Sequence, residues 1–395
     1  MLITTLRFFS NIRFSFIVPY LEVSPGIKLC SNAIDDIALY WMLALFLGFI
    51  SGAYILGKYG ENKGILCLCK VIVLGTVLPC LLLYVLGSQE NYIINNNAAL
   101  LSIRFINAFF HPAAFVVAAV FLMKIYNNTI SLKISAYIVF TTITGMQTSY
   151  FVVTYLAKNN LSLWCQLFLA SSLLAGAICM LCGKTVEEQT KKITTPKTQN
   201  KTDPLAIVLA VLIGCIFNAG LRYHYFFVDT YITDILIAEN DPSLGYVFFY
   251  IALSIFLLIA GHLLKQHHQL KILTVSLIGI LLVGIAPVIL PIHSLVNYIV
   301  YQITFAFFLA GFLAPSLSVI FSLFKDNQTI FHTTMWFTVG YALGNIISDW
   351  FTEQYGFFTH FHFLPMIPLI FGGFCCLAIL TSTNVNRLIK PNKPQ

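Results

Sequence analysis

The chain has 395 residues, of which 58% are hydrophobic and only 9% are charged. Soluble globular proteins carry about 25% charged residues, so this composition excludes a soluble multi-domain protein. The formal net charge is +7, and a basic excess of this kind reflects either a nucleic-acid partner or membrane topology.

Apolar runs of about 20 residues recur along the chain, and each can cross the hydrocarbon core as a helix. They do not alternate in polarity as the strands of an outer-membrane barrel would. The sequence therefore predicts an all-α membrane protein with twelve transmembrane helices. In chain order these spans are 3–22, 35–57, 64–87, 97–123, 132–157, 161–182, 204–229, 243–264, 270–290, 296–323, 330–351 and 361–383.

One long polar connector divides the spans into six and six. We predict an N-terminal six-helix bundle over 1–182, a basic cytoplasmic linker over 183–203, a C-terminal bundle over 204–383 and a cytoplasmic tail over 384–395. An alignment that pairs Arg13 with Arg222 also brings "ISGAYILGK" onto "IAGHLLKQH". Such a parallel repeat is typical of one large class of transporters, with the substrate site at the repeat interface.

The basic residues predict the orientation of the spans. With the N-terminus inside, sixteen of the 22 Lys and Arg residues are cytoplasmic, and only Lys28 and Lys158 are outside. This positive-inside bias explains the net charge, so no nucleic-acid partner is needed. Arg13 interrupts the first apolar run and no cleavage site follows it, so we expect this span to be retained. We predict a location in the inner (plasma) membrane with both termini cytoplasmic.

Six plus six spans with a basic central loop resemble the major facilitator superfamily. The loop "GAYILGKYGENKG" resembles the Gly-x-x-x-Asp-Arg-x-Gly-Arg-Arg signature of that superfamily, with Lys58 and Gly60 at matching positions. The run "RFINAFFHPAA" is similar to a motif of the metabolite:proton symporters of proline, betaine and dicarboxylates, with Arg104 matching and Asn107 replacing a Gln. "TVGYALGNI" is similar to a Gly-Tyr-Asn-rich stretch of the same family. The resemblance implies two pseudo-symmetric six-helix bundles, secondary transport, and a gating loop at Lys58 and Gly60.

Three arginines interrupt apolar spans at similar depths. Arg13 lies about 13 Å, and Arg104 and Arg222 about 10 Å, from the outer ends of their spans. A charged side chain at the bilayer centre costs about 2.5–3.5 kcal/mol even on the scale from membrane-insertion experiments, which gives the lowest values. Such a side chain usually faces a cavity or a partner. Guanidinium binds carboxylate or phosphate through two parallel hydrogen bonds, so we predict that Arg13 and Arg222 clamp an anionic or zwitterionic substrate. Two alternatives stay open: Arg13 could reach the headgroups, and Arg104 could have a structural role, pairing with helix carbonyls or with gating residues.

Further polar side chains share helix faces with these arginines, because spacings of i, i+3 or i+4, and i+7 lie on one face. The predicted substrate-binding residues are Arg13, Arg104, Asn107, His111, Gln147, Asn218, Arg222, Tyr225, Gln302 and Asn345. No Asp or Glu occupies the middle third of a span, so the candidates for proton coupling are His111, His224, Asp229 and Asp349. The loop histidines lack partner ligands at zinc spacing, and we expect neither a metal nor a cofactor.

The sequence thus predicts a secondary active transporter, expected to be monomeric. It would move a small organic anion or zwitterion (a carboxylate, an amino acid or a phosphorylated metabolite), with proton symport or anion exchange as the driving force. Alternatives are a non-transporting receptor or sensor with a transporter fold, and a multidrug or metabolite exporter. A membrane acyl- or glycosyltransferase is disfavoured because no sizeable polar catalytic loop occurs. An ATP-driven pump is disfavoured because Gly-x-x-x-x-Gly-Lys-Ser/Thr is absent.

Overall fold

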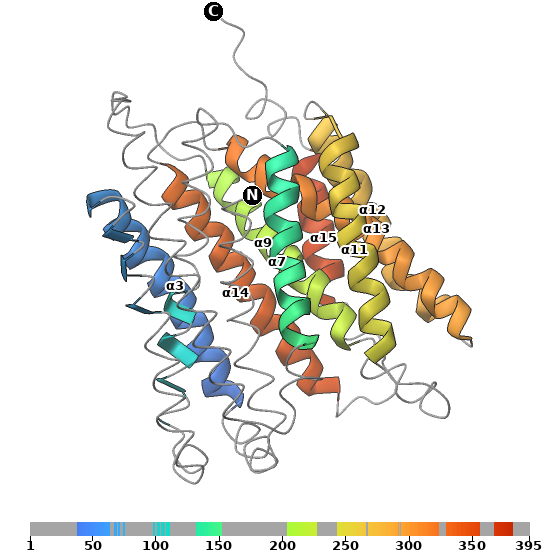
Figure 1. Cartoon of the computed structure of the whole chain (residues 1–395), viewed down its shortest axis with the longest axis horizontal. Helices are drawn as coiled ribbons and strands as arrows, with labels where there is room; N and C mark the ends of the chain where they lie inside the picture. The colour runs from blue at the N-terminus through green and yellow to red at the C-terminus, as the bar shows by residue number, and fades with distance from the viewer. Residues whose placement is uncertain are drawn as a thin grey trace, which may run out of the picture. The chain divides into compact units, whose positions relative to one another are not determined.

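In a computed structural model of the chain, almost all of the described residues are helical. The described residues are 38–63, 67–68, 70–71, 74–75, 98, 101–102, 104–106, 108–110, 132–151, 204–226, 243–265, 268–290, 292, 294–323, 329–355 and 367–381. Their long helices are α3 (Ala38–Lys63), α7 (Leu132–Phe151), α9 (Pro204–Phe226), α11 (Ser243–Leu263), α12 (Gln269–Ile289), α13 (Leu295–Leu323), α14 (Thr329–Tyr355) and α15 (Ile367–Leu380) (Figure 1). Each of these helices overlaps a predicted span, which confirms the all-α class.

Length and composition explain why these segments form membrane helices. Four windows within the described residues are long and apolar enough to cross a bilayer: Met42–Gly60, Pro204–Leu221, Gln269–Pro287 and Val296–Leu323. α9 begins at Pro204, since proline lacks the N–H that the first helical turn leaves unpaired. The predicted spans 3–22 and 161–182 lie outside the described residues, so the count of twelve stays a prediction.

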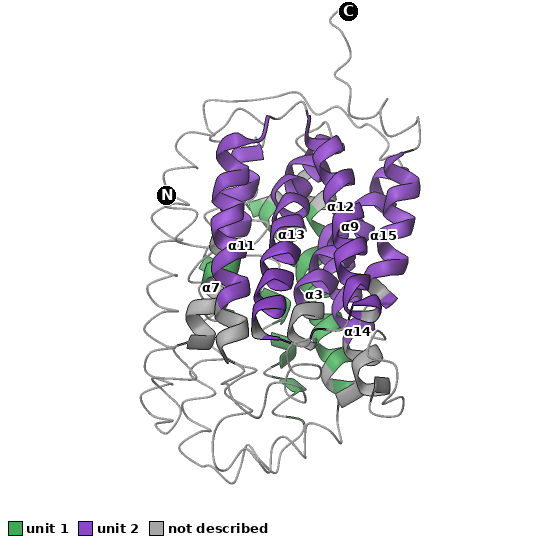
Figure 2. Cartoon of the chain, turned by 90° about the vertical axis from the view of Figure 1, so that its right-hand side faces the viewer, with its two compact units in different colours: residues 1–128, 141–199, 330–335 green, residues 129–140, 200–329, 336–395 purple. Residues whose placement is uncertain are grey.

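The chain forms two compact units (Figure 2). Unit 1 comprises Met1–Asn128, Thr141–Gln199 and Ile330–Met335, and unit 2 comprises Thr129–Phe140, Asn200–Thr329 and Trp336–Gln395. Two helices therefore contribute residues to both units. The first turns of α7 belong to unit 2, and residues 330–335 of α14 belong to unit 1. The predicted linker, 183–203, lies outside the described residues.

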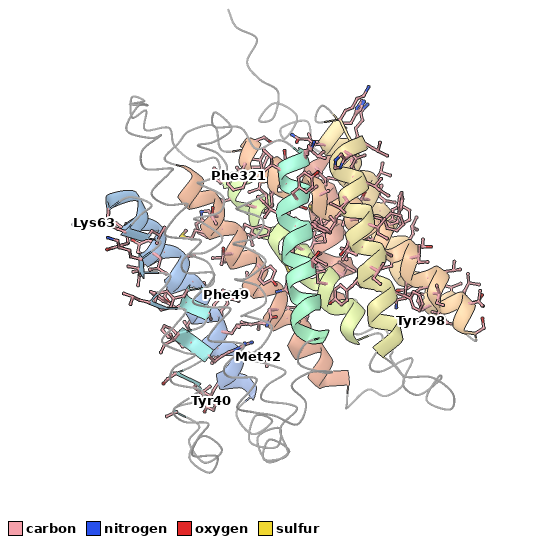
Figure 3. All side chains as sticks on the ribbon, in the orientation of Figure 1. Tyr40, Met42, Phe49, Lys63, Tyr298 and Phe321 are labelled. Atoms are coloured by element: carbon pink, nitrogen blue, oxygen red, sulfur yellow. The ribbon has the colours of Figure 1, made fainter. Side chains whose placement is uncertain are left out.

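In unit 2, α13 packs against both α11 and α12, and α15 packs against α9 and α12. Aromatic pairs join α11 to α13, with ring centroids 6.1 Å apart for Phe249 and Phe305 and 5.3 Å apart for Phe256 and Phe307. Such pairs contribute about 0.5–1.5 kcal/mol beyond the area they bury. Tyr298 and Phe321 lie toward opposite ends of α13 (Figure 3), and both are buried.

In unit 1, two glycines of α3 allow close contact with the helical residues of the fourth predicted span. A Cβ atom on Gly48 would lie 2.6 Å from the Cβ of Ala108 and 2.7 Å from the carbonyl oxygen of Phe105. A Cβ on Gly52 would overlap the backbone of Phe109. Small residues are what permit such backbone approach between membrane helices. This crossing fixes the position of the segment that carries Arg104.

Candidate substrate-binding site

Arg104 is a buried charge within unit 1. Its side chain is 3% exposed, and it lies on a helical segment next to the Gly48 crossing. Of the described side chains, Arg104 is the one charged group that is buried. Burial of a permanent cation among apolar helices is costly, so the site has to compensate it. Asn107 and His111, predicted to share its face, lie outside the described residues, as do Arg13 and Asp229.

α9 carries the predicted site residues of the seventh span on one continuous helix. Asn218, Arg222 and Tyr225 all fall within Pro204–Phe226, so their spacing places them on one face. His224 also lies within this helix, whereas the side chains from Arg222 onward are outside the described set. The positions of all three residues therefore fall on one described helix, and the clamp itself stays a prediction.

The side chain of Asn218 joins two helices of unit 2. It is 2% exposed, and its Nδ2 donates a hydrogen bond to the carbonyl oxygen of Tyr341 in α14 at 2.8 Å. The rings of Phe217 and Phe337 meet edge to face beside it, with centroids 5.6 Å apart. Asn218 was predicted as a substrate ligand; the structure gives its amide a structural bond as well.

Replacing Asn218 with alanine is expected to lower the free energy of unfolding by about 0.5–1.5 kcal/mol, the net value of one intramolecular hydrogen bond. Thermal unfolding of the purified protein in detergent measures this change. Thr381→Ala is the control, because the Thr381 hydroxyl bonds only to carbonyls of its own helix end. If the thermal midpoint of Asn218→Ala is unchanged and equals that of the control, the hydrogen bond of Asn218 does not stabilise the fold.

Glycines bring α9 and α14 into direct backbone contact around this hydrogen bond. A Cβ on Gly340 would overlap the Val211 carbonyl, and one on Gly214 would overlap the Phe337 carbonyl. A Cβ on Gly344 would lie 2.5 Å from the Cys215 carbonyl oxygen. These three glycines, one on α9 and two on α14, therefore fix where along α14 the helix α9 packs. They thereby also fix where the backbone of Arg222 lies relative to α14.

Among the predicted ligands whose side chains are described, Gln302 is the most completely buried. Its side chain is 0% exposed on α13, one turn after Tyr298 and one turn before Phe305. Within the described residues, neither Nε2 nor Oε1 of this amide has a hydrogen-bond partner. A buried carboxamide without partners costs about 1–3 kcal/mol. Such a cost is typical of a group whose role lies in binding.

Replacing Gln302 with leucine is expected to raise the thermal midpoint while weakening substrate uptake, because the change removes a buried amide that contributes no bond to stability. Gln269→Leu is a matched control, since Oε1 of Gln269 accepts a hydrogen bond from Ser318 Oγ at 2.9 Å. That variant should lose stability. If both variants are destabilised equally, Gln302 has a structural role and the binding role is wrong.

Asn345 belongs to a stripe of buried polar side chains along α14. Thr334 is 0%, Thr338 6%, Asn345 6% and Ser348 1% exposed. Intervals of four, seven and three residues keep these four on one face of the helix. Sequence reasoning selected only Asn345 from this stripe. The same spacing test, applied to hydroxyl side chains as well as amides, would have found the other three.

The remaining predicted residues fall on described helices without a described site role. Gln147 lies within α7 and Asp349 within α14, and their side chains are outside the described set. Lys58 is exposed, with its Nζ 5.7 Å from the Tyr54 ring centroid. A Cβ on Gly60 would lie 2.6 Å from Leu68 Cδ2, so this glycine lets Leu68 pack closely. The gating role of Lys58 and Gly60 stays a prediction.

The helices define a major facilitator fold, and solved structures of that fold match nearly the whole chain. A doubly tryptophan-substituted form of the xylose symporter XylE has a TM-score of 0.76 at 13% identity, covering 100% of this chain and 96% of its own. The human organic anion transporter TETRAN gives 0.67 at 11% identity, with 98% of each chain covered. The E. coli fucose:proton symporter FucP has a TM-score of 0.66 at 11% identity, covering 99% of this chain and 98% of its own. No family model and no curated protein matches the sequence.

Proposed function

We propose that the protein is a secondary active transporter that moves a small organic anion or zwitterion by alternating access. The fold supports this class, because two six-helix bundles that rock around a central site are how such transporters work. Its structural neighbours include transporters of sugars and of organic anions by name. At 11–13% identity these neighbours share the fold only, so the substrate class has to come from this chain's own residues.

The observation that supports an anionic substrate is that the guanidinium group of Arg104 is buried. A cavity with fixed positive charge favours negative cargo over lipophilic cations. Arg13 and Arg222 would add one cation from each half of the chain, and Gln302 and Asn345 would supply neutral hydrogen bonds. The metabolite:proton symporters remain the subfamily that the motifs suggest, with His111, His224, Asp229 and Asp349 as candidates for proton coupling.

Lysines at one end of unit 2 support the proposed orientation in the inner membrane. Lys133 near the start of α7, Lys265 just after α11 and Lys271 in the first turn of α12 are all exposed. These positions meet at one end, since the Lys133 carbonyl lies 3.7 Å from a Cβ built on Gly261 near the end of α11. By the positive-inside rule this end faces the cytoplasm.

Uptake into proteoliposomes tests the proposal. Purified protein would be assayed with a dicarboxylate (succinate), a zwitterion (proline), a sugar phosphate (glucose 6-phosphate) and a neutral sugar (xylose), with and without a pH gradient. We expect saturable uptake and counterflow for one of the charged classes. Uptake of xylose alone would contradict an anion carrier. Binding of an anion without flux would instead support the sensor alternative.

A further inference from the structure

The beginning of α7 contacts two other helices of unit 2 (Figure 2). Tyr137 Oη lies 3.1 Å from His262 Nε2 of α11, and the two rings meet edge to face with centroids 5.8 Å apart. Ser135 Oγ donates a hydrogen bond to the carbonyl oxygen of Ala314 in α13. These contacts hold the first turns of α7 beside the last turn of α11.

Two lysines from segments far apart in the sequence lie at this contact. A Cβ built on Gly261 would lie 3.0 Å from the Cβ of Ala136 and 3.9 Å from the Cα of Lys133, so the backbones of α7 and α11 approach closely. Lys133 therefore lies beside the end of α11, and Lys265 follows just after that helix ends at Leu263. Both lysines are exposed. The contact thus presents two ammonium groups to its surroundings.

The adjoining sequence contains no acidic side chain that could offset these charges. α7 has no Asp or Glu, and none occurs from Ser243 to Lys325. Lys133 also lies in the first turn of α7, where the positive end of the helix dipole disfavours a cation and favours an anion. A negative group bound here would therefore neutralise both lysines and interact favourably with the start of the helix.

An exposed apolar ridge runs along α11 from this lysine pair. Ile251, Ile255, Ile259 and Leu263 recur at every fourth residue and so form one row on the helix surface. Each of these side chains is between 44% and 73% exposed. The row is about 18 Å long, and one leaflet supplies about half of the roughly 30 Å hydrocarbon core. An acyl chain whose headgroup lies at the lysines would therefore cover the ridge through the depth of one leaflet.

We propose that Lys133, Lys265 and this ridge form a binding site for one anionic phospholipid. The phosphate lies between the two ammonium groups, and an acyl chain lies along the ridge. A soluble anion would satisfy the lysines and leave the ridge uncovered, so the combination of charge and apolar surface favours a lipid. Basic sites between transmembrane helices on the cytoplasmic side are a known form of headgroup recognition. The lipid site goes beyond the proposed transport function and does not depend on the transported substrate.

Native mass spectrometry of the full-length protein measures this binding. Purified protein in detergent would be titrated with dioleoyl phosphatidylglycerol, or with dioleoyl phosphatidylcholine, which has the same acyl chains and no net charge. The wild type should retain phosphatidylglycerol preferentially, and equal retention of the two lipids would overturn the proposal. Lys133→Gln/Lys265→Gln should weaken retention by roughly tenfold or more, because each lysine near the membrane surface contributes about a factor of five. Lys265→Gln alone should weaken it by about fivefold, and covers the case in which the double variant fails to fold.

Lys271→Gln is the matched control, because Lys271 is an exposed lysine in the first turn of α12 and not at the contact between α7 and α11. This variant should retain phosphatidylglycerol as the wild type does. Equal losses in Lys271→Gln and Lys265→Gln would indicate diffuse attraction to surface charge and would overturn a defined site. Glycerol 3-phosphate, a headgroup without acyl chains, should not displace the lipid when present in excess. Displacement by glycerol 3-phosphate would assign the lysines to a soluble anion instead.

A tryptophan on the ridge tests where the acyl chain lies. Ile255 lies about 12 Å along α11 from Leu263, a depth within reach of the middle of an oleoyl chain. In Ile255→Trp, phosphatidylglycerol brominated at its double bonds should quench the added fluorescence more than equally brominated phosphatidylcholine. The same titration of the wild type gives the signal of the native tryptophans for subtraction. Lys133→Gln/Lys265→Gln should abolish the difference between the lipids, whereas equal quenching by both lipids before those substitutions would overturn the placement of the lipid.

Discussion

Replacing Arg222 with alanine is expected to lower anion uptake by roughly a hundredfold or more. Loss of a charged partner from a buried, hydrogen-bonded pair costs about 2–5 kcal/mol, and 1.4 kcal/mol is a factor of ten. The expectation rests on α9, which remains helical through Phe226 and places Arg222 one turn after the buried Asn218. Initial rates in proteoliposomes, measured at equal reconstituted protein, give the effect.

A second substitution at Arg222 separates charge from shape, and variants at two other positions serve as comparisons. Arg222→Lys keeps the cation but loses the planar fork that binds a carboxylate twice, so we expect intermediate uptake. Lys271→Ala removes an exposed cation from the first turn of α12 and should leave the rate unchanged. Arg13→Ala should match Arg222→Ala if the two arginines act as a pair. Uptake at the wild-type rate in both alanine variants would exclude the clamp.

Replacing Gly340 with alanine is expected to remove most of the folded protein. The new Cβ would lie 2.7 Å from the carbonyl carbon and 2.8 Å from the Cα of Val211, and would overlap the carbonyl oxygen of the same residue. Backbone cannot rotate away as a side chain can, so α9 and α14 would have to separate. Overpacking in a well-packed core costs about 1–3 kcal/mol, occasionally more, and here the Asn218–Tyr341 hydrogen bond is strained as well.

Gly372→Ala provides the comparison for this prediction. A Cβ on Gly372 would lie 3.4 Å from Ile216 Cγ1, an ordinary contact with a flexible side chain. We expect a monodisperse peak and a near-normal thermal midpoint for Gly372→Ala on size-exclusion chromatography. We expect aggregation or a strongly lowered midpoint for Gly340→Ala. Equal behaviour of the two variants would show that the α9–α14 crossing is looser than described.

Apolar runs were sufficient to predict where the described helices lie, but not which helices pack together. Span boundaries follow from composition, and α9 begins at the predicted Pro204. Which helices pack together depends on close contacts that leave no local signal in the sequence. Gly340 is one of many glycines in apolar segments, and the partner of Asn218 is a backbone carbonyl more than a hundred residues away.

The candidate site was predictable in its residue types and only partly in its roles. A charge or an amide inside an apolar run is conspicuous, which is why Arg104, Gln302 and Asn345 were selected and are found buried. The hydroxyls of Thr334, Thr338 and Ser348 were missed because threonine and serine are common in membrane helices. Tyr137 and His262 were missed as a pair because each is unremarkable alone. Only the fold brings them within hydrogen-bond distance.

The sharing of α7 and α14 between the units also constrains biosynthesis. Residues 129–140 are made early but belong to unit 2, and residues 330–335 are made late but belong to unit 1. Neither unit can reach its final packing until the ribosome has synthesised almost the entire chain. A fragment ending in the central linker would lack a piece of its own unit and would leave exposed the α7 surface that α11 and α13 cover. Chaperone or insertase protection of that surface during translation is the requirement that follows.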